Sequence, residues 1–209
     1  MRNLLHGLYG ITDSGLMPDE PSLIDGARAA LSGGMRVLQY RDKHAERDVK
    51  TRRAKMLREL CDEAGALLII NDDVELAADC AADGIHLGRD DTAPEAARRR
   101  LGDRAIVGAS CYNQLSRAVA AAEAGCDYVA FGRFFPSLSK PNAVQAEAGL
   151  IEQARRRLSI PLCAIGGITL DNVSSLVEQQ VDMVAVIQGL FATQDIEQTA
   201  RRFSALFRY

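Results

Sequence analysis

Short runs of apolar, often β-branched residues alternate along the chain with longer segments in which apolar positions recur every three or four residues. The short runs predict strands, and the longer segments predict helices that follow them. The predicted strands cover residues 8–11, 35–40, 67–71, 84–87, 105–110, 128–131, 162–166 and 183–187. The clearest predicted helices cover residues 48–64, 114–124, 150–158 and 195–207. This alternation indicates a parallel sheet, and eight strands favour a closed barrel over an open, doubly wound sheet. We therefore expect a single (β/α)8 TIM barrel.

Local signals predict where several helices begin and end. Gly33 and Gly34, and Gly65, are typical of helix ends. Thr92 with Glu95 has the spacing of a capping box at a helix start. The long, proline-containing loop at 132–147 follows the sixth predicted strand, and loops of this length inside a compact domain are usually functional.

Composition narrows the class of protein. The 209 residues suit one domain, spanning 1–209, and the formal net charge of -3 gives no electrostatic reason to bind nucleic acid or an anionic membrane. Five scattered cysteines without a C-x-x-C pair argue against a disulfide framework or a zinc site. No apolar run is long enough to span a bilayer, and the start of the chain lacks the pattern of a signal peptide. We expect a cytoplasmic protein.

In a TIM barrel the active site lies at the carboxyl ends of the strands, so the residues that follow each strand are the candidates. After the second predicted strand, side-chain alternation places Gln39, Arg41 and Lys43 on one face and Tyr40 and Asp42 on the other. An amide, a guanidinium and an ammonium on one face predict an anion clamp. The alternative is a solvated loop with scattered charges.

Acidic residues follow the next two predicted strands. Asp72 follows the third strand and Asp91 follows the fourth. Mg2+ binds one or two carboxylates together with phosphate oxygens and waters, so these residues are candidate metal ligands. Asp72 has a structural alternative as an N-cap paired with Glu75. Asp91 is harder to explain in that way, because Thr92 already serves as the predicted cap.

Glycines mark the ends of the last two predicted strands. Gly166 and Gly167 follow the seventh strand, and Gly189 follows the eighth. Glycine lets backbone N–H groups approach a phosphate closely, and residues 189–192 are suited to the short extra helix of a barrel phosphate site. The alternative is that these glycines only turn the chain.

The remaining candidates are hydroxyls, one ammonium and one histidine. Ser137, Ser139 and Lys140 in the long loop are suited to a lid that brings donors to an anion, although a flexible surface loop is the alternative. Ser110 ends the fifth strand and adds one hydroxyl. His86 ends the fourth strand, where it contacts a ligand or is purely structural. No Ser-His-Asp or Cys-His set is evident. Such a site is suited to stabilising a departing phosphate anion rather than to general-base hydrolysis.

Together these residues resemble the thiamine phosphate synthase family over nearly the whole chain. The matching pieces are Leu8-Tyr9-Gly10-Ile11-Thr12-Asp13, Gln39-x-Arg41-x-Lys43, Asn71-Asp72-Asp73, His86-Leu87-Gly88 with Asp91, Gly108-Ala109-Ser110, Phe135-Pro136-Ser137-x-Ser139-Lys140-Pro141, Ala164-Ile165-Gly166-Gly167-Ile168 and Val184-Ala185-Val186-Ile187. One such motif is weak evidence, but the ordered set is specific.

The resemblance implies a function and a set of roles. The family condenses hydroxymethylpyrimidine pyrophosphate with thiazole phosphate, which gives thiamine monophosphate and pyrophosphate. By resemblance, the pyrimidine pyrophosphate contacts Gln39, Arg41, Lys43, Asn71, Ser110 and Lys140. By resemblance, the thiazole phosphate contacts Ser137, Ser139, Gly167, Ile187 and Gln188. Asp72 and Asp91 would bind Mg2+, and the catalytic residues would be Arg41, Lys43, Lys140 and Ser110. The family resemblance also suggests a homodimer.

Departures from the family pattern leave two rival functions open. Ser137 and Ser139 stand where many relatives have threonine, and Gln188 stands where serine also occurs. The related thiazole tautomerase uses a histidine at the position of Tyr112, and it has no need of a pyrophosphate clamp. The second rival is a non-catalytic barrel that senses a thiamine precursor. Each rival would bind thiazole phosphate without condensing it.

Overall fold

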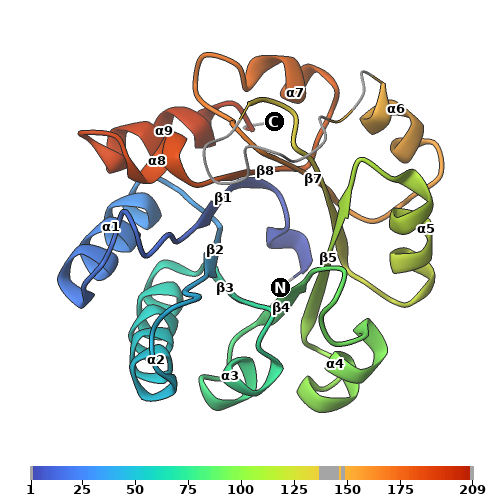
Figure 1. The fold of residues 1–209 in the computed structure, drawn as a ribbon. Helices are drawn as coiled ribbons and strands as arrows, with labels where there is room; N and C mark the ends of the chain where they lie inside the picture. Colours follow the sequence, from blue (N-terminus) through green and yellow to red (C-terminus); the bar gives the residue numbers. More distant parts are fainter. Residues whose placement is uncertain (1, 137–145, 147–148, 208–209) are drawn as a thin grey trace.

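Eight parallel strands form a closed barrel in the computed structural model, which describes residues 2–136, 146 and 149–207. Each strand pairs with the next one along the chain, and β8 pairs with β1 to close the ring (Figure 1). The strands are β1 (Gly7–Ile11), β2 (Val37–Tyr40), β3 (Leu67–Asn71), β4 (Gly84–Leu87), β5 (Ile106–Tyr112), β6 (Tyr128–Phe131), β7 (Leu162–Ile165) and β8 (Met183–Val186). The predicted TIM barrel is confirmed, and its strand boundaries differ from the predicted ones by at most two residues.

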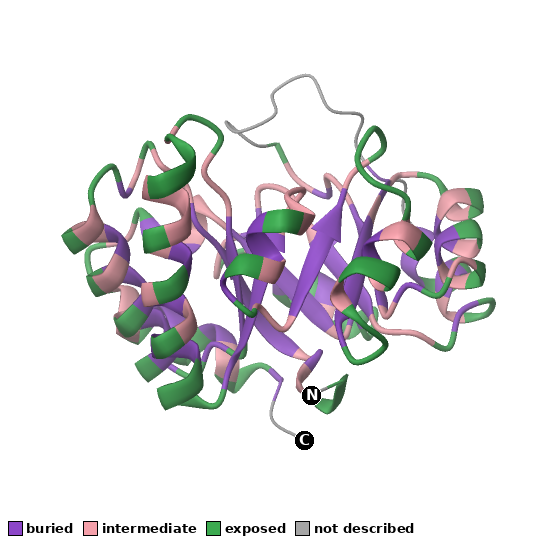
Figure 2. Ribbon diagram, turned by 90° about the horizontal axis from the view of Figure 1, so that it is seen from below, coloured by how far each residue is buried: buried purple, intermediate pink, exposed green. Residues whose placement is uncertain are grey.

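Helices surround the barrel as an outer ring (Figure 1). They are α1 (Glu20–Ser32), α2 (Arg47–Ala64), α3 (Val74–Asp79), α4 (Pro94–Leu101), α5 (Leu115–Glu123), α6 (Leu150–Arg155), α7 (Ser174–Glu178), α8 (Gln188–Phe191) and α9 (Ile196–Ala205), with a 3-10 helix η1 at Arg2–Leu4. In side view, buried residues follow the strands and the inner faces of the helices, and exposed residues cover the outer faces (Figure 2). None of the helices in the described part of the chain has the length and hydropathy needed to cross a membrane.

Two predictions about helix starts need correction. Thr92 does not cap α4: the N-cap is Ala93, which makes no side-chain cap hydrogen bond. Pro94 occupies the first turn, where its fixed φ suits the first helical position, and this moves the cap one residue beyond the threonine. At α3, the cap is Asp73 rather than Asp72, and its side chain accepts a hydrogen bond from the N–H of Leu76 at 2.8 Å.

Apolar side chains fill the barrel interior. They form a cluster of inward-facing residues from the strands, closed at the amino-terminal end by Leu5, which follows η1. Tyr9 and Tyr128 are the two largest members, and their rings meet edge to face with centroids 6.0 Å apart. Gly108 on β5 makes room for this pair, because a Cβ at that position would collide with the ring of Tyr128.

The amino-terminal end of the barrel carries a repeated arrangement that we call the basal clamps. In each, an aspartate just before an even-numbered strand accepts a hydrogen bond from a backbone N–H of the preceding strand and from an arginine on an outer helix. The three clamps are Asp83 with Leu68 and Arg58, Asp127 with Val107 and Arg98, and Asp182 with Leu162 and Arg155. The backbone N–H groups lie 2.8, 2.8 and 2.7 Å from the carboxylates. Every carboxylate of the basal clamps therefore has an opposite charge beside it.

Candidate active site

A cavity of about 300 Å³ lies at the carboxyl ends of the strands. All eight strands, together with segments that follow several of them, contribute to its walls. It brings together seven of the residues to which the family resemblance gives a substrate contact: Gln39, Arg41, Asn71, Ser110, Gly167, Ile187 and Gln188. Residues separated by up to 149 positions in the chain (188 − 39) thus line one hollow.

The predicted clamp follows β2. Gln39 is buried inside the barrel, and Arg41 lines both the cavity and an adjoining hollow that also contains Lys43. Thr12, at the end of β1, fixes the backbone of Arg41: its Oγ1 accepts from the Arg41 N–H at 2.8 Å and donates to the Arg41 carbonyl at 3.2 Å. Gln39 and Arg41 both line the cavity, as the alternation predicts, whereas Lys43 lines only the adjoining hollow, together with Asp42.

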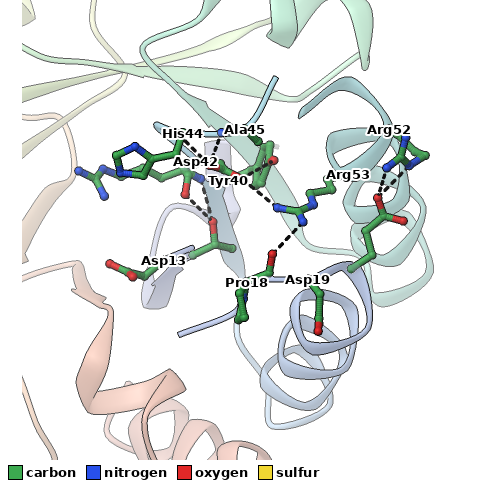
Figure 3. A network of polar contacts seen from close by, with 12 residues as sticks. Asp13, Pro18, Asp19, Tyr40, Asp42, His44, Ala45, Arg52 and Arg53 are labelled. Carbon is green, nitrogen blue, oxygen red and sulfur yellow. Dashed lines mark hydrogen bonds and ion pairs between the residues drawn. The ribbon is translucent and has the colours of Figure 1, made fainter. Parts of the chain in front are cut away.

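Asp42 anchors this loop from the outside (Figure 3). Its carboxylate accepts hydrogen bonds from the N–H groups of His44 and Ala45, each at 3.1 Å, and from Arg53 on α2 at 3.0 Å. Burial alone would raise the pKa of Asp42, but these backbone N–H groups and the Arg53 guanidinium together lower it. Arg53 also donates to the carbonyl of Pro18 at 2.9 Å, which joins the loop to the start of α1. The turn that carries Arg41 and Lys43 is therefore held by charged hydrogen bonds.

Asp72 and Asp91 meet at the ends of β3 and β4. Asp72 adopts a left-handed backbone conformation with φ of 63°, which is uncommon for a residue other than glycine. Burial and the Asp91 carboxyl raise the pKa of Asp72 to about 6, against the opposing effects of Asn71 and the Lys43 ammonium. Asp91 in turn accepts a hydrogen bond from the Gly88 N–H at 2.6 Å. The half-buried Asp72 thus lies beside a second carboxyl group, Asp91, which hinders its ionisation.

This pair has the chemistry of a partial Mg2+ site. Carboxylate oxygens are the protein ligands that Mg2+ prefers, and it commonly takes only one or two of them and completes its shell with phosphate oxygens and waters. No group of three or more His, Cys, Asp or Glu residues suited to a metal occurs within residues 2–136, 146 and 149–207. A cation held by Asp72 and Asp91 therefore needs further oxygens from a ligand, and it would relieve the repulsion between the two carboxylates.

The segments after β7 and β8 close the other side of the cavity. Gly167 has φ of 65°, and a Cβ there would collide with the carbonyl of Pro136. The Phe135 N–H donates to the Gly166 carbonyl at 3.0 Å, so the loop after β6 starts against these glycines. Ser137, Ser139 and Lys140 of that loop lie outside the described residues. The short helix predicted at 189–192 is present as α8.

Sequence reasoning assigned no role to Tyr9 and Tyr128. Their hydroxyls lie 2.8 Å apart inside the barrel, and they join Gln39 to His86, whose ring also contacts Ser110. The sequence does show that both residues are tyrosines at inward-facing strand positions, and this was the available signal. No local pattern, however, indicates that β1 and β6 face each other across the barrel.

Tyr112 lines the cavity and is bounded by cations. Its φ is 54°, and the guanidinium groups of Arg89 and Arg117 lie 4.9 and 5.6 Å from its ring centroid. A tyrosine packed in this way has no proton-accepting group comparable to the histidine that the tautomerase carries at this position.

Comparison with known proteins gives concordant results. Residues 8–190 match the family model described as thiamine monophosphate synthase. The thiamine-phosphate synthase of Nitrosococcus oceani is 45% identical over 99% of this chain and 95% of its own length, and that of Thioalkalivibrio sulfidiphilus is 48% identical over 97% and 96%. Among solved structures, thiamine phosphate pyrophosphorylase from Pyrococcus furiosus superposes with a TM-score of 0.88 at 33% identity, covering 98% of this chain and 96% of that one.

Proposed function

The chain belongs to the thiamine monophosphate synthase family, and from this membership we propose how its active site carries out the family reaction. The enzyme is a transferase that joins hydroxymethylpyrimidine pyrophosphate to thiazole phosphate and releases pyrophosphate. The proposal concerns the residues that bind each substrate, the metal and the order in which bonds break and form.

Arg41 and Lys43 stabilise the departing pyrophosphate in this proposal. The observation that carries it is the meeting of Asp72 and Asp91 beside Lys43, because cations and paired carboxylates in one place suit a metal-bound diphosphate. Lys140, outside the described residues, is the third cation of the proposed clamp. Preorganised donors aimed at developing negative charge are among the strongest catalytic contributions known.

Asp72 and Asp91 are the residues that would hold Mg2+. When bound, the ion supplies charge neutralisation to the diphosphate oxygens. Asn71, Ser110 and Gln39 line the cavity, and we assign them to the pyrimidine part of the substrate.

No side chain has to remove a proton in the proposed mechanism. The carbon–oxygen bond to pyrophosphate breaks first, and the electron pair leaves with the oxygen. The amino group of the pyrimidine ring stabilises the carbocation, and the thiazole nitrogen then donates its own lone pair to form the new carbon–nitrogen bond. His86 fits this account, because both of its ring nitrogens have hydrogen-bond partners inside the protein. One nitrogen lies 2.9 Å from the Tyr128 hydroxyl and the other lies 2.8 Å from the Ser110 hydroxyl.

The thiazole phosphate is assigned to the far wall of the cavity. Gly167, Ile187 and Gln188 line that wall, and barrels commonly bind phosphate after the seventh and eighth strands. Ser137 and Ser139 complete the proposed set. At residue 188 we assign the phosphate contact to the backbone, so that glutamine can stand where serine also occurs in the family.

A homodimer and a cytoplasmic location belong to the same proposal, on the strength of family resemblance and composition. Small-molecule substrates are consistent with the family, and the net charge of -3 gives no reason to expect nucleic acid as a partner. Light scattering of the purified protein tests the dimer. The expected mass in solution is twice the chain mass of 22.7 kDa.

A condensation assay tests the function. The purified protein, both substrates and Mg2+ should yield thiamine phosphate, measured as fluorescent thiochrome after oxidation, and chelation of the metal should abolish the product. Fluorescence no higher than in an enzyme-free control would reject the synthase. Binding of thiazole phosphate without product would then favour the tautomerase-like or the binding-only alternative, and isomerisation of the thiazole would separate these two.

A further inference from the structure

A continuous chain of hydrogen bonds crosses the interior of the barrel. Gln39 Nε2 lies 2.6 Å from the Tyr9 hydroxyl, which lies 2.8 Å from the Tyr128 hydroxyl. Tyr128 lies 2.9 Å from His86 Nδ1, and His86 Nε2 lies 2.8 Å from Ser110 Oγ. Of these five residues all except Tyr128 line the cavity, so the hydrogen-bond chain starts and ends at the proposed pyrimidine site.

The two tyrosines in the middle of the chain can each supply only one proton. Burial is the main cause that raises the pKa of both Tyr9 and Tyr128 far above the ordinary value for a phenol, so both stay protonated. A phenol has one O–H donor, and a neutral imidazole has one N–H donor and one acceptor nitrogen. An unpaired donor in this buried place would be costly, which restricts how the protons can be arranged.

The protons can be followed from the Gln39 end. The Gln39 amide N–H donates to Tyr9, so the Tyr9 proton is left for Tyr128, the other partner of its hydroxyl. Tyr128 must then donate to His86 Nδ1. A neutral His86 that accepts at Nδ1 carries its proton on Nε2, and that N–H donates to Ser110 Oγ. The Ser110 proton is left over, and Ser110 lines the cavity.

We propose that Tyr9 and Tyr128 are positioning residues that fix the tautomer of His86 and thereby turn the Ser110 hydroxyl into a hydrogen-bond donor toward the substrate. The identity of that substrate rests on the proposed function, but the proton arrangement does not. Ser110 is the catalytic residue in contact with the substrate, and the tyrosines act through it. The hydrogen-bond chain thus selects a ligand that places an acceptor atom at Ser110.

The opposite direction is the natural competitor. If the Gln39 carbonyl oxygen faced Tyr9, each proton would move to the other side of its hydrogen bond. His86 would then carry its proton on Nδ1, and Ser110 would donate inward and present only an acceptor to the cavity. The two arrangements differ at one measurable atom, the protonated nitrogen of His86.

Nitrogen NMR of the full-length protein labelled with 15N-histidine distinguishes these arrangements. The protein has three histidines, and the signals that disappear in His86→Asn belong to His86. The expected result is a neutral ring with its proton on Nε2, without any substrate present. A proton on Nδ1, or a charged ring, would overturn the proposal. This measurement stands even if the condensation assay fails, whereas absence of product with an Nε2 proton would reject only the function.

Two phenylalanine variants test the tyrosines. Tyr128→Phe removes the donor to Nδ1, so His86 should become a mixture of tautomers. We expect kcat/KM to fall by about 10- to 100-fold, by analogy with the loss of the hydrogen-bond partner of a metal-ligating histidine. Tyr9→Phe leaves Tyr128 able to donate to His86, so the tautomer should persist and the loss should be smaller. Tyr40→Phe is the matched control, because Tyr40 is a buried strand tyrosine that faces the outer helices and contacts Asp42 at 3.5 Å.

A double-mutant cycle separates positioning from general stability. Once Ser110→Ala has removed the terminal hydroxyl, adding Tyr128→Phe should change kcat/KM little, because residues that act through one another are not additive. Losses that multiply would show that Tyr128 does not act through Ser110. If Tyr128→Phe does not fold, the His86 tautomer of the unaltered protein still decides the direction.

Discussion

The two ends of this barrel treat charge in opposite ways. At the amino-terminal end, the aspartates of the basal clamps each contact an arginine and a backbone N–H. At the carboxyl-terminal end, Asp72 faces another carboxylate, Asp91, and within the described residues neither Arg41 nor Lys43 forms an ion pair. The charges of the basal clamps satisfy each other, whereas Arg41, Lys43 and the Asp72–Asp91 pair are left for a ligand.

This difference has an energetic consequence. The folded-state pKa of Asp72 is raised to about 6, so its ionised form disfavours folding at every pH above the ordinary carboxyl pKa. Its left-handed φ of 63° adds backbone strain, which in non-glycine residues is concentrated at functional sites. The active end is therefore a source of instability that the rest of the fold, including the basal clamps, has to offset.

The largest expected effect comes from removing a carboxylate at the active end. Asp72→Asn keeps the side-chain shape and a residue type that tolerates left-handed backbone, but it removes one anionic metal ligand. We expect turnover to fall about a thousandfold, which corresponds to the loss of several kcal/mol of charge stabilisation in the transition state. The Mg2+ concentration that gives half-maximal activity (the Mg2+ midpoint) should rise. Thermal stability without metal should stay the same or increase, because repulsion from Asp91 is relieved.

Asp91→Asn should behave in the same way, since the amide oxygen can still accept from the Gly88 N–H. Asp73→Asn is the matched control, because this neighbouring carboxylate caps α3 and contacts Arg47 rather than the cavity. An unchanged Mg2+ titration in both Asp72 and Asp91 variants would return these aspartates to a structural role. A clear loss of stability in Asp72→Asn would contradict the comparison between the two ends.

The next largest effect is expected from removing the Arg41 guanidinium at the active end. Arg41→Ala should lower kcat by about one to three orders of magnitude, comparable to the loss of one donor to a developing oxyanion. The fold should be retained, because Thr12 holds the backbone of residue 41 rather than its side chain. Arg52→Ala on the exposed face of α2, where Arg52 pairs with Glu20, is the control and should leave kcat unchanged. Near-normal turnover in Arg41→Ala would remove this residue from the clamp.

Much of the active end could be predicted from the sequence because its signals are local. Strand alternation alone places Gln39 and Arg41 on one face and Asp42 on the other, and the barrel rule brings successive strand ends together. Local signals also misled. Asp72 with Glu75 and Thr92 with Glu95 both have capping-box spacing, yet Asp73 and Ala93 are the caps. In the second case Pro94 fixed the start of the helix more strongly than the hydroxyl of the threonine did.

The basal clamps and the interior hydrogen-bond chain could not be predicted in the same way. Tyr9 and Tyr128 are 119 residues apart, and Arg98 and Asp127 are 29 residues apart. Each partner taken alone is an ordinary inward tyrosine, a helix arginine or an aspartate in a turn. Their meaning comes from strand register and from closure of the barrel, which place them within hydrogen-bond distance only in three dimensions.

The smallest effect is expected at the amino-terminal end, and it should appear in stability alone. Asp127 is 7% exposed, and its carboxylate contacts Arg98 and the Val107 N–H on one oxygen and Arg2 on the other. Asp127→Asn keeps one acceptor but leaves two arginines without a counter-charge, so we expect a loss of about 2 kcal/mol in the free energy of unfolding. For a chain of this size the melting temperature should fall by about 4 to 8 °C.

Catalysis should not change in Asp127→Asn. At temperatures where Asp127→Asn is folded, kcat and the Mg2+ midpoint should equal those of the unaltered protein, because the clamp lies at the opposite end of the barrel from the cavity. Glu152→Gln removes an exposed ion pair with Arg156 and should cost less than about 0.5 kcal/mol, which sets the scale for a surface charge. If Asp127→Asn lost activity while folded, the two ends would be coupled, and the division of charge between stability and catalysis would be wrong.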